Sequence, residues 1–472
     1  MELQKPTHVV LLSSPGLGHL FPVIELGNRF VLHHNFKVTI ITVTSNAQTH
    51  ILTPELCEII EIPSPNICGL VENDAAVCTR LCVMMREAKP AIKSALSNMT
   101  LRPSALIVDI FCTEALSIAE EFSIRKYVYI ASHAWFVSLL IYSPVLDKEL
   151  KGQYVDQSEP LKIPGCKPVR PEDVIDPMLD RNDLQYEELL RIANEVPKSD
   201  GVLVNTWEEF QRKELEALRD GDLLGGILKV PVYSIGPIVR QHVSETDSLV
   251  VQWLDEQPSE SVVYVSFGSG GTMSYEQMTE LAWGLELSGQ RFIWVVRTPI
   301  EGAADAAFFT AGNNVENENN QLAKYLPEGF ISRTHKLGLL VPQWAPQVTI
   351  LRHSSIGGFF SHCGWGSTLE SITNGVPMIA WPLYAEQRLN ATLLAEEVGV
   401  AVRSKLLTTT TKVVGREEIA RMVRQIIQVD ENVKSNPIRE KAKEIKRSAM
   451  IALSKGGSSY TAFSQVAKII EG

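Results

Sequence analysis

Short, almost uninterrupted apolar runs separated by helix-length segments constrain this chain more than any other feature. They lie at residues 9–12, 37–43, 105–110, 126–131 and 202–204, and again at 262–267, 292–296, 339–341, 356–360 and 378–380. Such runs are typical of parallel strands that helices bury on both faces. Two series in one chain predict an α/β fold with two doubly wound parallel sheets.

The length of 472 residues agrees with two domains. A polar segment without apolar periodicity begins at residue 240 and predicts a linker. We therefore expect an N-terminal domain at 1–239, a linker at 240–257 and a C-terminal domain at 258–455. Residues 456–472 have helical spacing and are expected to pack back on the N-terminal domain. A second polar stretch, 301–321, predicts a surface loop.

Composition excludes some classes of partner. The 44 basic and 55 acidic residues give a net charge of −11, which disfavours a nucleic-acid partner. The seven cysteines lack metal-binding spacing and are expected to be free thiols in a reducing compartment. Neither a leader-peptide pattern nor an apolar run of about 20 residues is found. We expect a cytoplasmic monomer without a membrane span.

Three Gly-rich turns, at residues 13–19, 266–271 and 364–370, join a predicted strand to a predicted helix. Glycine lets the backbone approach a ligand, and a helix N-terminus presents N–H groups to anions. Ser274 and Gln277 predict a helix start just after the second turn, and Ser367 is the candidate N-cap of the third. Together the turns predict one anionic ligand at the carboxyl ends of the strands.

Three alternatives involve other chemistry. A nicotinamide oxidoreductase would need a third glycine where Phe21 stands and an acidic residue after strand 37–43, which this chain lacks. Asp220-Gly221-Asp222 matches the metal-binding motif of one class of sugar transferase, but its position after a predicted helix favours a turn. A non-catalytic nucleotide-sugar binding protein would keep the stretch at residues 344–387 but would not need a base.

Residues 344–387 carry a much more specific pattern. They include Trp344-Ala345-Pro346-Gln347, His362-Cys363-Gly364-Trp365, Glu370-Ser371, Gly375-Val376-Pro377, Trp381-Pro382 and Glu386-Gln387. In this stretch and along the whole chain, the sequence resembles the plant family 1 UDP-glycosyltransferases, and within them the phenol-glucosylating, hydroquinone-type group. The resemblance implies the GT-B fold, in which two Rossmann-like domains face each other across a cleft.

The activity that the resemblance implies is metal-independent, inverting transfer of glucose from UDP-glucose to the hydroxyl of a small phenol or indoxyl. His19 would be the general base, and Asp109 would orient it and stabilise its protonated form. Imidazole titrates at about pH 6.5, which suits this task at neutral pH. Trp344 would stack on uracil, with Ala345 and Gln347 completing the nucleoside pocket. From the residues alone, a core tryptophan that follows a strand is the favoured interpretation of Trp344.

Other donor-site roles are also implied. Glu370 would hold the ribose, since a carboxylate can accept two hydrogen bonds. His362 and helix N-termini would offset the charge of departing UDP. The remaining expected UDP-sugar-binding residues are Gly18, Ser269, Trp365, Gly366, Ser367, Glu386 and Gln387, the last two at the sugar. The family usually has Asn where this chain has Gly366. We therefore expect the donor to bind more weakly or differently, because one polar contact near the phosphate and the sugar is missing. The expected acceptor pocket comprises Met85, Glu87, Trp135 and Phe136.

Overall fold

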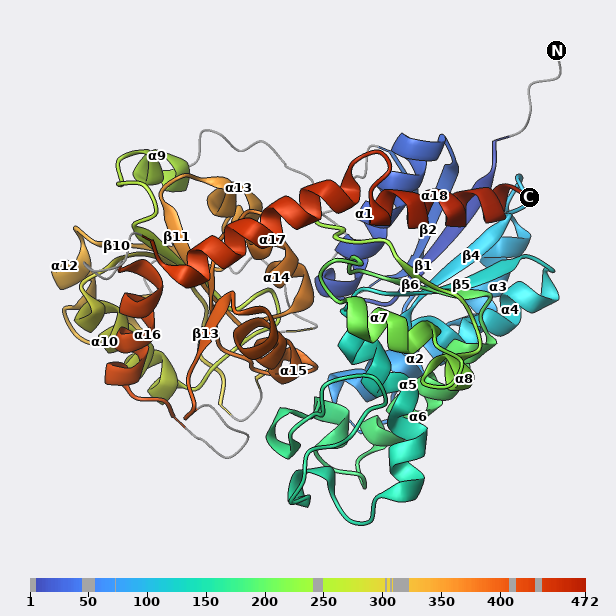
Figure 1. The fold of residues 1–472 in the computed structure, drawn as a ribbon, viewed down its shortest axis with the longest axis horizontal. Helices are drawn as coiled ribbons and strands as arrows, with labels where there is room; N and C mark the ends of the chain where they lie inside the picture. The colour runs from blue at the N-terminus through green and yellow to red at the C-terminus, as the bar shows by residue number, and fades with distance from the viewer. Residues whose placement is uncertain are drawn as a thin grey trace. The chain divides into compact units, whose positions relative to one another are not determined.

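The computed structural model describes residues 6–44, 56–72, 74–240, 249–301, 304–305, 308, 322–406, 413–428 and 435–472. Most of the predicted loop at 301–321 and residues 241–248 of the predicted linker lie outside them. The chain forms two compact units (Figure 1): unit 1 comprises Met1–Val239 and Ala449–Gly472, and unit 2 comprises Arg240–Ser448. Among the described residues, no helix has the length and apolarity that crossing a membrane requires.

Unit 1 contains a seven-stranded parallel sheet in the order β3-β2-β1-β4-β5-β6-β7. The strands are β1 His8–Ser13, β2 Lys37–Val43, β3 Glu58–Ile62, β4 Ala105–Asp109, β5 Arg125–Ile130, β6 Gly201–Val204 and β7 Val232–Ser234. Strand β1 pairs with β2 on one side and with β4 on the other. The strand order reverses between β1 and β4, and ligands bind at the carboxyl ends of the strands at such a switch point.

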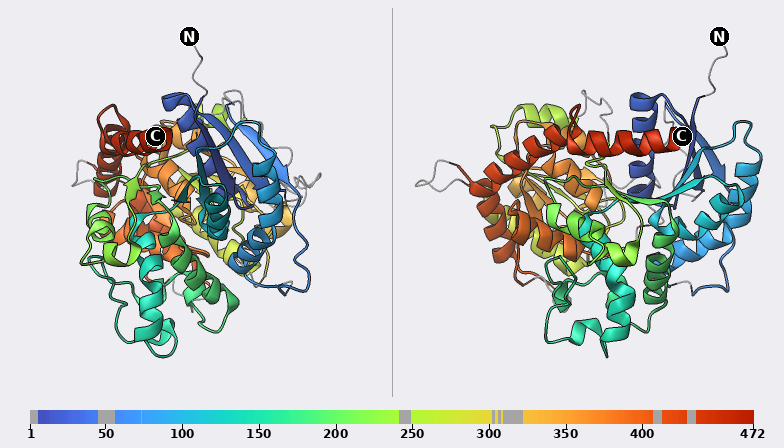
Figure 2. Two further views of the ribbon diagram at one scale, coloured as in Figure 1. Left: turned by 90° about the vertical axis from the view of Figure 1, so that its right-hand side faces the viewer. Right: turned by 45° about the vertical axis from the view of Figure 1, so that its right-hand side comes forward.

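Helices enclose the sheet of unit 1 (Figure 2). The α-helices are α1 Leu17–His34, α2 Val77–Glu87, α3 Lys89–Ser97, α4 Leu116–Glu121, α5 Ala134–Glu149, α6 Leu184–Glu195, α7 Arg212–Arg219, α8 Gly225–Leu228 and α18 Ser458–Glu471. The 3₁₀ helices are η1 Ile110–Ala115, η2 Tyr154–Asp156, η3 Pro171–Asp173, η4 Asp176–Met178 and η5 Val196–Lys198. The C-terminal helix α18 belongs to this core, because Phe463 and Ile470 pack with Phe30 of α1 and Leu11 of β1.

Unit 2 contains a six-stranded parallel sheet in the order β10-β9-β8-β11-β12-β13. The strands are β8 Val262–Ser266, β9 Arg291–Val296, β10 Gly338–Pro342, β11 Ile356–Ser361, β12 Met378–Ala380 and β13 Ala401–Arg403. Numbered from one, this order is 3-2-1-4-5-6, the Rossmann order that the first six strands of unit 1 also follow. Its switch point lies between β8 and β11.

The helices of unit 2 cover its sheet. Leu281 of α10 and Met422 of α16, for example, pack in one core with Trp294 and Phe360 of the strands. The helices are α9 Leu249–Asp255, α10 Tyr275–Ser288, α11 Leu322–Tyr325, α12 Phe330–Thr334, α13 Gln347–Arg352, α14 Trp365–Ile372, α15 Gln387–Thr392, the π-helix η7 Leu393–Val398 and α16 Arg416–Ile427. Helix α17 Pro437–Leu453 begins in unit 2, and its residues from Ala449 on belong to unit 1. Helix α9 occupies part of the segment predicted as a linker.

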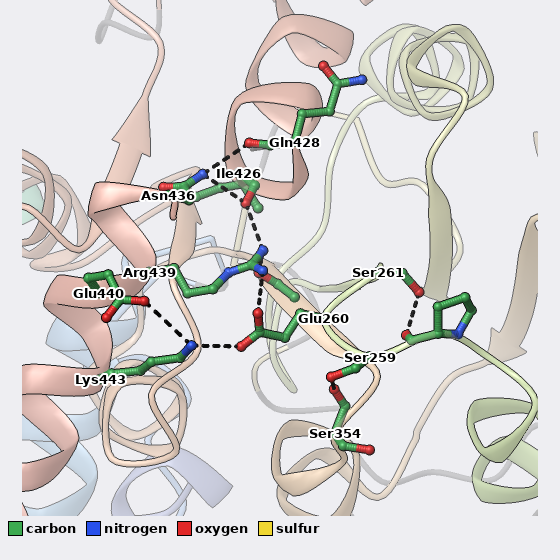
Figure 3. Close-up of polar contacts among 12 residues, drawn as sticks. Ser259, Glu260, Ser261, Ser354, Ile426, Gln428, Asn436, Arg439, Glu440 and Lys443 are labelled. Carbon is green, nitrogen blue, oxygen red and sulfur yellow. Dashed lines mark hydrogen bonds and ion pairs between the residues drawn. The ribbon is translucent and has the colours of Figure 1, made fainter. Parts of the chain in front are cut away.

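A cluster of charges attaches α17 to the amino end of β8 (Figure 3). The buried guanidinium of Arg439 donates to Glu260 Oε2 at 2.7 Å and to the carbonyl oxygen of Ile426 at 3.1 Å. Lys443 Nζ lies 3.0 Å from Glu260 Oε1. Burial would raise the pKa of Glu260, but the hydrogen bonds and charges of these two cations lower it below its ordinary value. The cluster lies at the opposite end of the strand from the Gly-rich turn, so we assign it to stability.

Candidate functional site

The first Gly-rich turn and the end of β4 bring His19 and Asp109 together. Strands β1 and β4 are neighbours, so the turn after β1 and the last residue of β4 lie at the same edge of the sheet. Gly16 caps α1 with φ of 109°, a conformation that favours glycine. His19, in the first turn of α1, places Nδ1 3.4 Å from Oδ1 and 3.3 Å from Oδ2 of Asp109. The structure therefore forms the pair within unit 1.

The charge of Asp109 is held inside the protein, whereas His19 reaches solvent. The side chain of Asp109 is 1% exposed and that of His19 is 23% exposed. Burial would raise the pKa of Asp109, but the His19 charge and hydrogen bonds from His19, Ser14 and the Ile110 N–H leave it below its ordinary value. An ionised Asp109 next to Nδ1 favours the tautomer in which Nδ1 carries the proton. Nε2, on the opposite side of the ring, is then the basic nitrogen.

Two further residues at this site were not predicted from the sequence. The hydroxyl of Ser14 donates to Asp109 Oδ2. The ring of Phe111 packs edge-on against the imidazole of His19, with centroids 5.0 Å apart. Both follow from the meeting of β1 and β4, because Ser14 directly follows β1 and Phe111 lies in η1, directly after β4. The sequence signal available was their proximity to His19 and Asp109 along the chain.

The switch point of unit 2 holds His362 between two glycines. A Cβ atom on Gly268 or on Gly364 would lie only 2.5 Å from His362 Nε2, so both positions require glycine here. Burial, together with the positive charge of Arg297, lowers the pKa of His362 to about 4. The imidazole is therefore neutral at neutral pH and can donate a hydrogen bond without bringing a charge. Arg297, whose guanidinium donates to the carbonyl of Ser269, supplies a cation beside this turn.

The helix after β11 begins earlier than the sequence predicted. Cys363 turns the chain with φ of 65°, and Gly364 is the N-cap of α14. Ser367 is therefore the third residue of the helix, and the prediction that it is the N-cap was wrong. The N–H groups in the first turn of a helix have no acceptor within the helix itself, as at any helix start. A Cβ atom on Gly366 would meet nothing within 4 Å.

The residues expected at the nucleoside lie between β10 and α14. The side chain of Trp344 is exposed (59%), so it is not a core tryptophan and its face can act as a stacking platform. Ala345 and Gln347 are buried behind it. The side-chain amide of Gln347 donates to Ser367 Oγ at 3.0 Å and to Glu370 Oε2 at 2.7 Å. These contacts connect the start of α13 with α14.

The residues expected at the sugar lie at the start of α15, in contact with the segment that follows β12. Gln387 Oε1 accepts from the backbone N–H groups of Leu383 and Tyr384 at 2.9 and 3.0 Å. Glu386 is half-buried, and Asn390 Nδ2 lies 3.4 Å from its Oε1. The same amide of Asn390 donates to the carbonyl of Cys363 at 2.8 Å. These bonds hold the start of α15 next to the loop that carries His362.

The residues expected in the acceptor pocket differ in position. Trp135 is 1% exposed, and its indole N–H donates to the carbonyl of Lys167 at 2.9 Å. Met85 is buried in α2, whereas Glu87, at the end of the same helix, is exposed. Phe136, in the first turn of α5, is half-buried. Within unit 1, Trp135 and Met85 thus fill the interior.

Two other predicted positions lie in turns, and the structure shows their local surroundings. The backbone N–H of Asp222 donates to Asp220 Oδ1 at 2.9 Å, which is turn chemistry, as the sequence favoured. Gly18, directly before His19, would carry a Cβ atom without any contact within 4 Å. Among the described residues, no group of three or more metal-ligating side chains is found.

Two Rossmann-type sheets with polar residues at their switch points agree with the GT-B class of glycosyltransferases. Residues 235–439 match the UDP-glucoronosyl and UDP-glucosyl transferase family. The chain is 56% identical to anthocyanidin 3-O-glucosyltransferase 5 of Manihot esculenta over 467 residues, which cover 97% of this chain and 94% of that protein. It is 41% identical to hydroquinone glucosyltransferase of Rauvolfia serpentina over 98% of each chain.

The chain belongs to the plant family 1 UDP-glycosyltransferases and is a UDP-glycosyltransferase. The crystal structure of TcCGT1 in complex with UDP is similar over 99% of each chain, with a TM-score of 0.90 and 46% identity. The family and the fold class predicted by the resemblance are thereby confirmed. Family membership disfavours the nicotinamide oxidoreductase alternative.

Proposed function

We propose that this protein transfers glucose from UDP-glucose to the hydroxyl of a small aromatic acceptor, inverting the anomeric carbon and using no metal ion. The observation that carries the proposal is the His19–Asp109 pair, in which a buried carboxylate orients a solvent-reaching imidazole. The relatives support the substrate class, because anthocyanidins and hydroquinone are both aromatic compounds with hydroxyl groups. Indoxyl, which the resemblance also implied, belongs to the same class of acceptor.

The base would act in a single displacement step. The acceptor hydroxyl donates to His19 Nε2 and gives up its proton to that nitrogen as its oxygen attacks the anomeric carbon. The bond from this carbon to the oxygen of the UDP β-phosphate breaks on the opposite face, and UDP leaves with the electron pair. Asp109 stabilises the imidazolium that forms, as in the serine-protease triad.

The donor residues of unit 2 supply binding and charge. Trp344 would stack on uracil, and Glu370 would accept hydrogen bonds from the ribose. The diphosphate would bind between the turn at 266–271 and the first turn of α14, since a helix N-terminus presents backbone N–H groups to anions. Since neutral His362 contributes no charge, Arg297 would provide the fixed positive charge at this end. Glu386 and Gln387 would bind the sugar hydroxyls.

A direct test compares the wild-type protein with His19→Ala. Transfer from UDP-glucose is measured by UDP release with a panel of acceptors that includes hydroquinone, indoxyl, a flavonoid and an aniline. General base catalysis contributes about 10²- to 10⁴-fold, so we expect that loss in kcat. The affinity for UDP, measured by calorimetry, should not change, because the expected UDP ligands other than Gly18 lie in unit 2. A fully active His19→Ala protein would refute the mechanism.

Two measurements test the remaining parts of the proposal. The anomeric proton coupling in the NMR spectrum of the product reports its configuration, and we expect the β-glucoside. Exhaustive EDTA treatment should leave the rate unchanged, whereas a strict metal requirement would contradict the metal-free reaction. A protein that binds UDP-glucose but transfers to no acceptor in the panel would contradict the proposed acceptor class.

A further inference from the structure

Arg240, the first residue of unit 2, forms an ion pair with the carboxylate expected to bind the ribose. Its Nε lies 3.1 Å from Glu370 Oε1, and the side chains are 28% and 7% exposed. The two residues are 130 positions apart in the sequence. No sequence motif predicted this contact, because Arg240 stands at the start of the polar segment predicted as a linker.

The contacts of Glu370 divide evenly between its two oxygens. Arg240 donates to Oε1, and Gln347 Nε2 donates to Oε2 at 2.7 Å. An ionised carboxylate offers about four lone-pair sites, two on each oxygen. With one site on each oxygen used by a described donor, one site on each is left without a donor among the described residues, and a ribose presents two neighbouring hydroxyls. The arrangement therefore matches a 1,2-diol.

We propose that Arg240 is a positioning residue for nucleotide recognition: by pairing with Glu370 it holds the carboxylate in the orientation that accepts both ribose hydroxyls. This inference rests on the proposed role of Glu370 in donor binding. It adds a residue outside the stretch 344–387 to the determinants of specificity for ribonucleotides over deoxyribonucleotides.

The physical argument is one of charge and orientation. A largely buried carboxylate without a cation carries a desolvation penalty and rotates toward any available donor. Gln347 alone would hold one oxygen and leave the other unconstrained, since one hydrogen bond does not fix rotation about the carboxylate axis. An arginine adds a second, charge-assisted contact on the other oxygen. Lysine in its place would preserve the charge with a less directional donor.

The test measures binding of UDP and of 2′-deoxy-UDP by calorimetry to the wild-type protein, Arg240→Gln, Arg240→Lys and Glu370→Gln. A hydrogen bond to a charged group is worth roughly tenfold or more in affinity, so we expect at least that preference for UDP in the wild type. In Arg240→Gln the preference should fall to about two- to threefold, through weaker UDP binding with almost unchanged 2′-deoxy-UDP binding. Arg240→Lys should retain more of the preference.

Controls separate this role from a structural one. Arg421→Gln removes an exposed i,i+3 partner of Glu418 in the same unit and should leave both affinities unchanged. An Arg240→Gln protein that loses affinity for both nucleotides equally, or for neither, overturns the inference. If that variant does not fold, as judged by its thermal unfolding, Arg240→Lys carries the same comparison. A Glu370→Gln protein that keeps the full preference for UDP would instead refute the ribose role of Glu370 and leave the base mechanism of His19 standing.

Discussion

Replacing Asp109 by Asn tests how strongly the buried carboxylate supports His19. The change preserves the size of the side chain but removes its charge. Opposite charges 3.3 Å apart, as are Nδ1 and Oδ2, interact by about 5 kcal/mol at an effective dielectric constant of about 20, and a charge-assisted hydrogen bond is worth about 1.5–3 kcal/mol net. Because the imidazolium forms only as the reaction proceeds, these limits predict a decrease in kcat of about tenfold to about 5,000-fold.

The assay is initial-rate kinetics with UDP-glucose and hydroquinone, followed by UDP release. The KM for UDP-glucose should stay within about twofold, because the expected donor-binding side chains lie in unit 2. Ser14→Ala is the matched control, since it removes a hydrogen bond to Asp109 but keeps the carboxylate, and it should reduce kcat by about tenfold or less. A folded Asp109→Asn protein with kcat within twofold of wild type would refute the reasoning.

Four further predictions follow from the structure. Trp344→Ala should weaken UDP binding by about 1–3 kcal/mol, the usual value of base stacking, and calorimetry that finds no loss would contradict its role. Gly366→Asn should fold with unchanged thermal stability, because a Cβ atom there meets nothing within 4 Å, and a destabilised protein would show that the space is not free. The same change should lower the KM for UDP-glucose severalfold, because it restores the asparagine that is usual in the family. The pKa of His362 is lowered to about 4, so below about pH 6.5 the imidazole of the unfolded chain binds a proton more readily than that of the folded protein, and stability falls. In urea unfolding, the wild type should lose about 2 kcal/mol more stability than His362→Gln between pH 7 and pH 5. Equal losses in the two proteins would contradict the argument from burial. Glu260→Gln should destabilise the protein by about 1–3 kcal/mol, because it weakens the ion pair of buried Arg439, and an unchanged unfolding midpoint would show that the cluster is dispensable.

The central strands were predictable because a strand that is buried on both faces consists of a nearly continuous run of apolar residues. All ten predicted strands form, with bounds that agree within one residue, or exactly at β2 and β12. The three strands that were not predicted, β3, β7 and β13, are all sheet edges. Strand β3 is partly exposed to solvent, as Glu58 and Glu61 show, and the other two strands are only three residues long. Short edge strands carry too little periodicity to be recognised.

The helix starts show a similar division. Ser274 caps α10 as predicted, accepting from the Gln277 N–H at 3.1 Å, because a capping contact is local. The reciprocal bond of the capping box does not form, since the Gln277 side chain bonds the backbone of Val414 instead, 137 residues away. At α14 the left-handed turn at Cys363 moved the start ahead of Ser367. The local preference of a residue for a capping position is overridden where tertiary contacts or the turn before the helix favour another arrangement.

By itself the sequence predicted the two parallel sheets and the Gly-rich turns at their strand ends, and its resemblance to a family predicted the class of enzyme and named His19 as the candidate base. These are properties of local pattern, or of motifs contained in one continuous stretch. Only the tertiary structure decided that Ser14 binds Asp109, that Trp344 is exposed, that His362 is buried beside Arg297 and that Arg240 pairs with Glu370. Each of these features depends on which strand ends become neighbours. A contact between residues that are 50 to 130 positions apart produces no periodic pattern in the sequence from which it could be predicted.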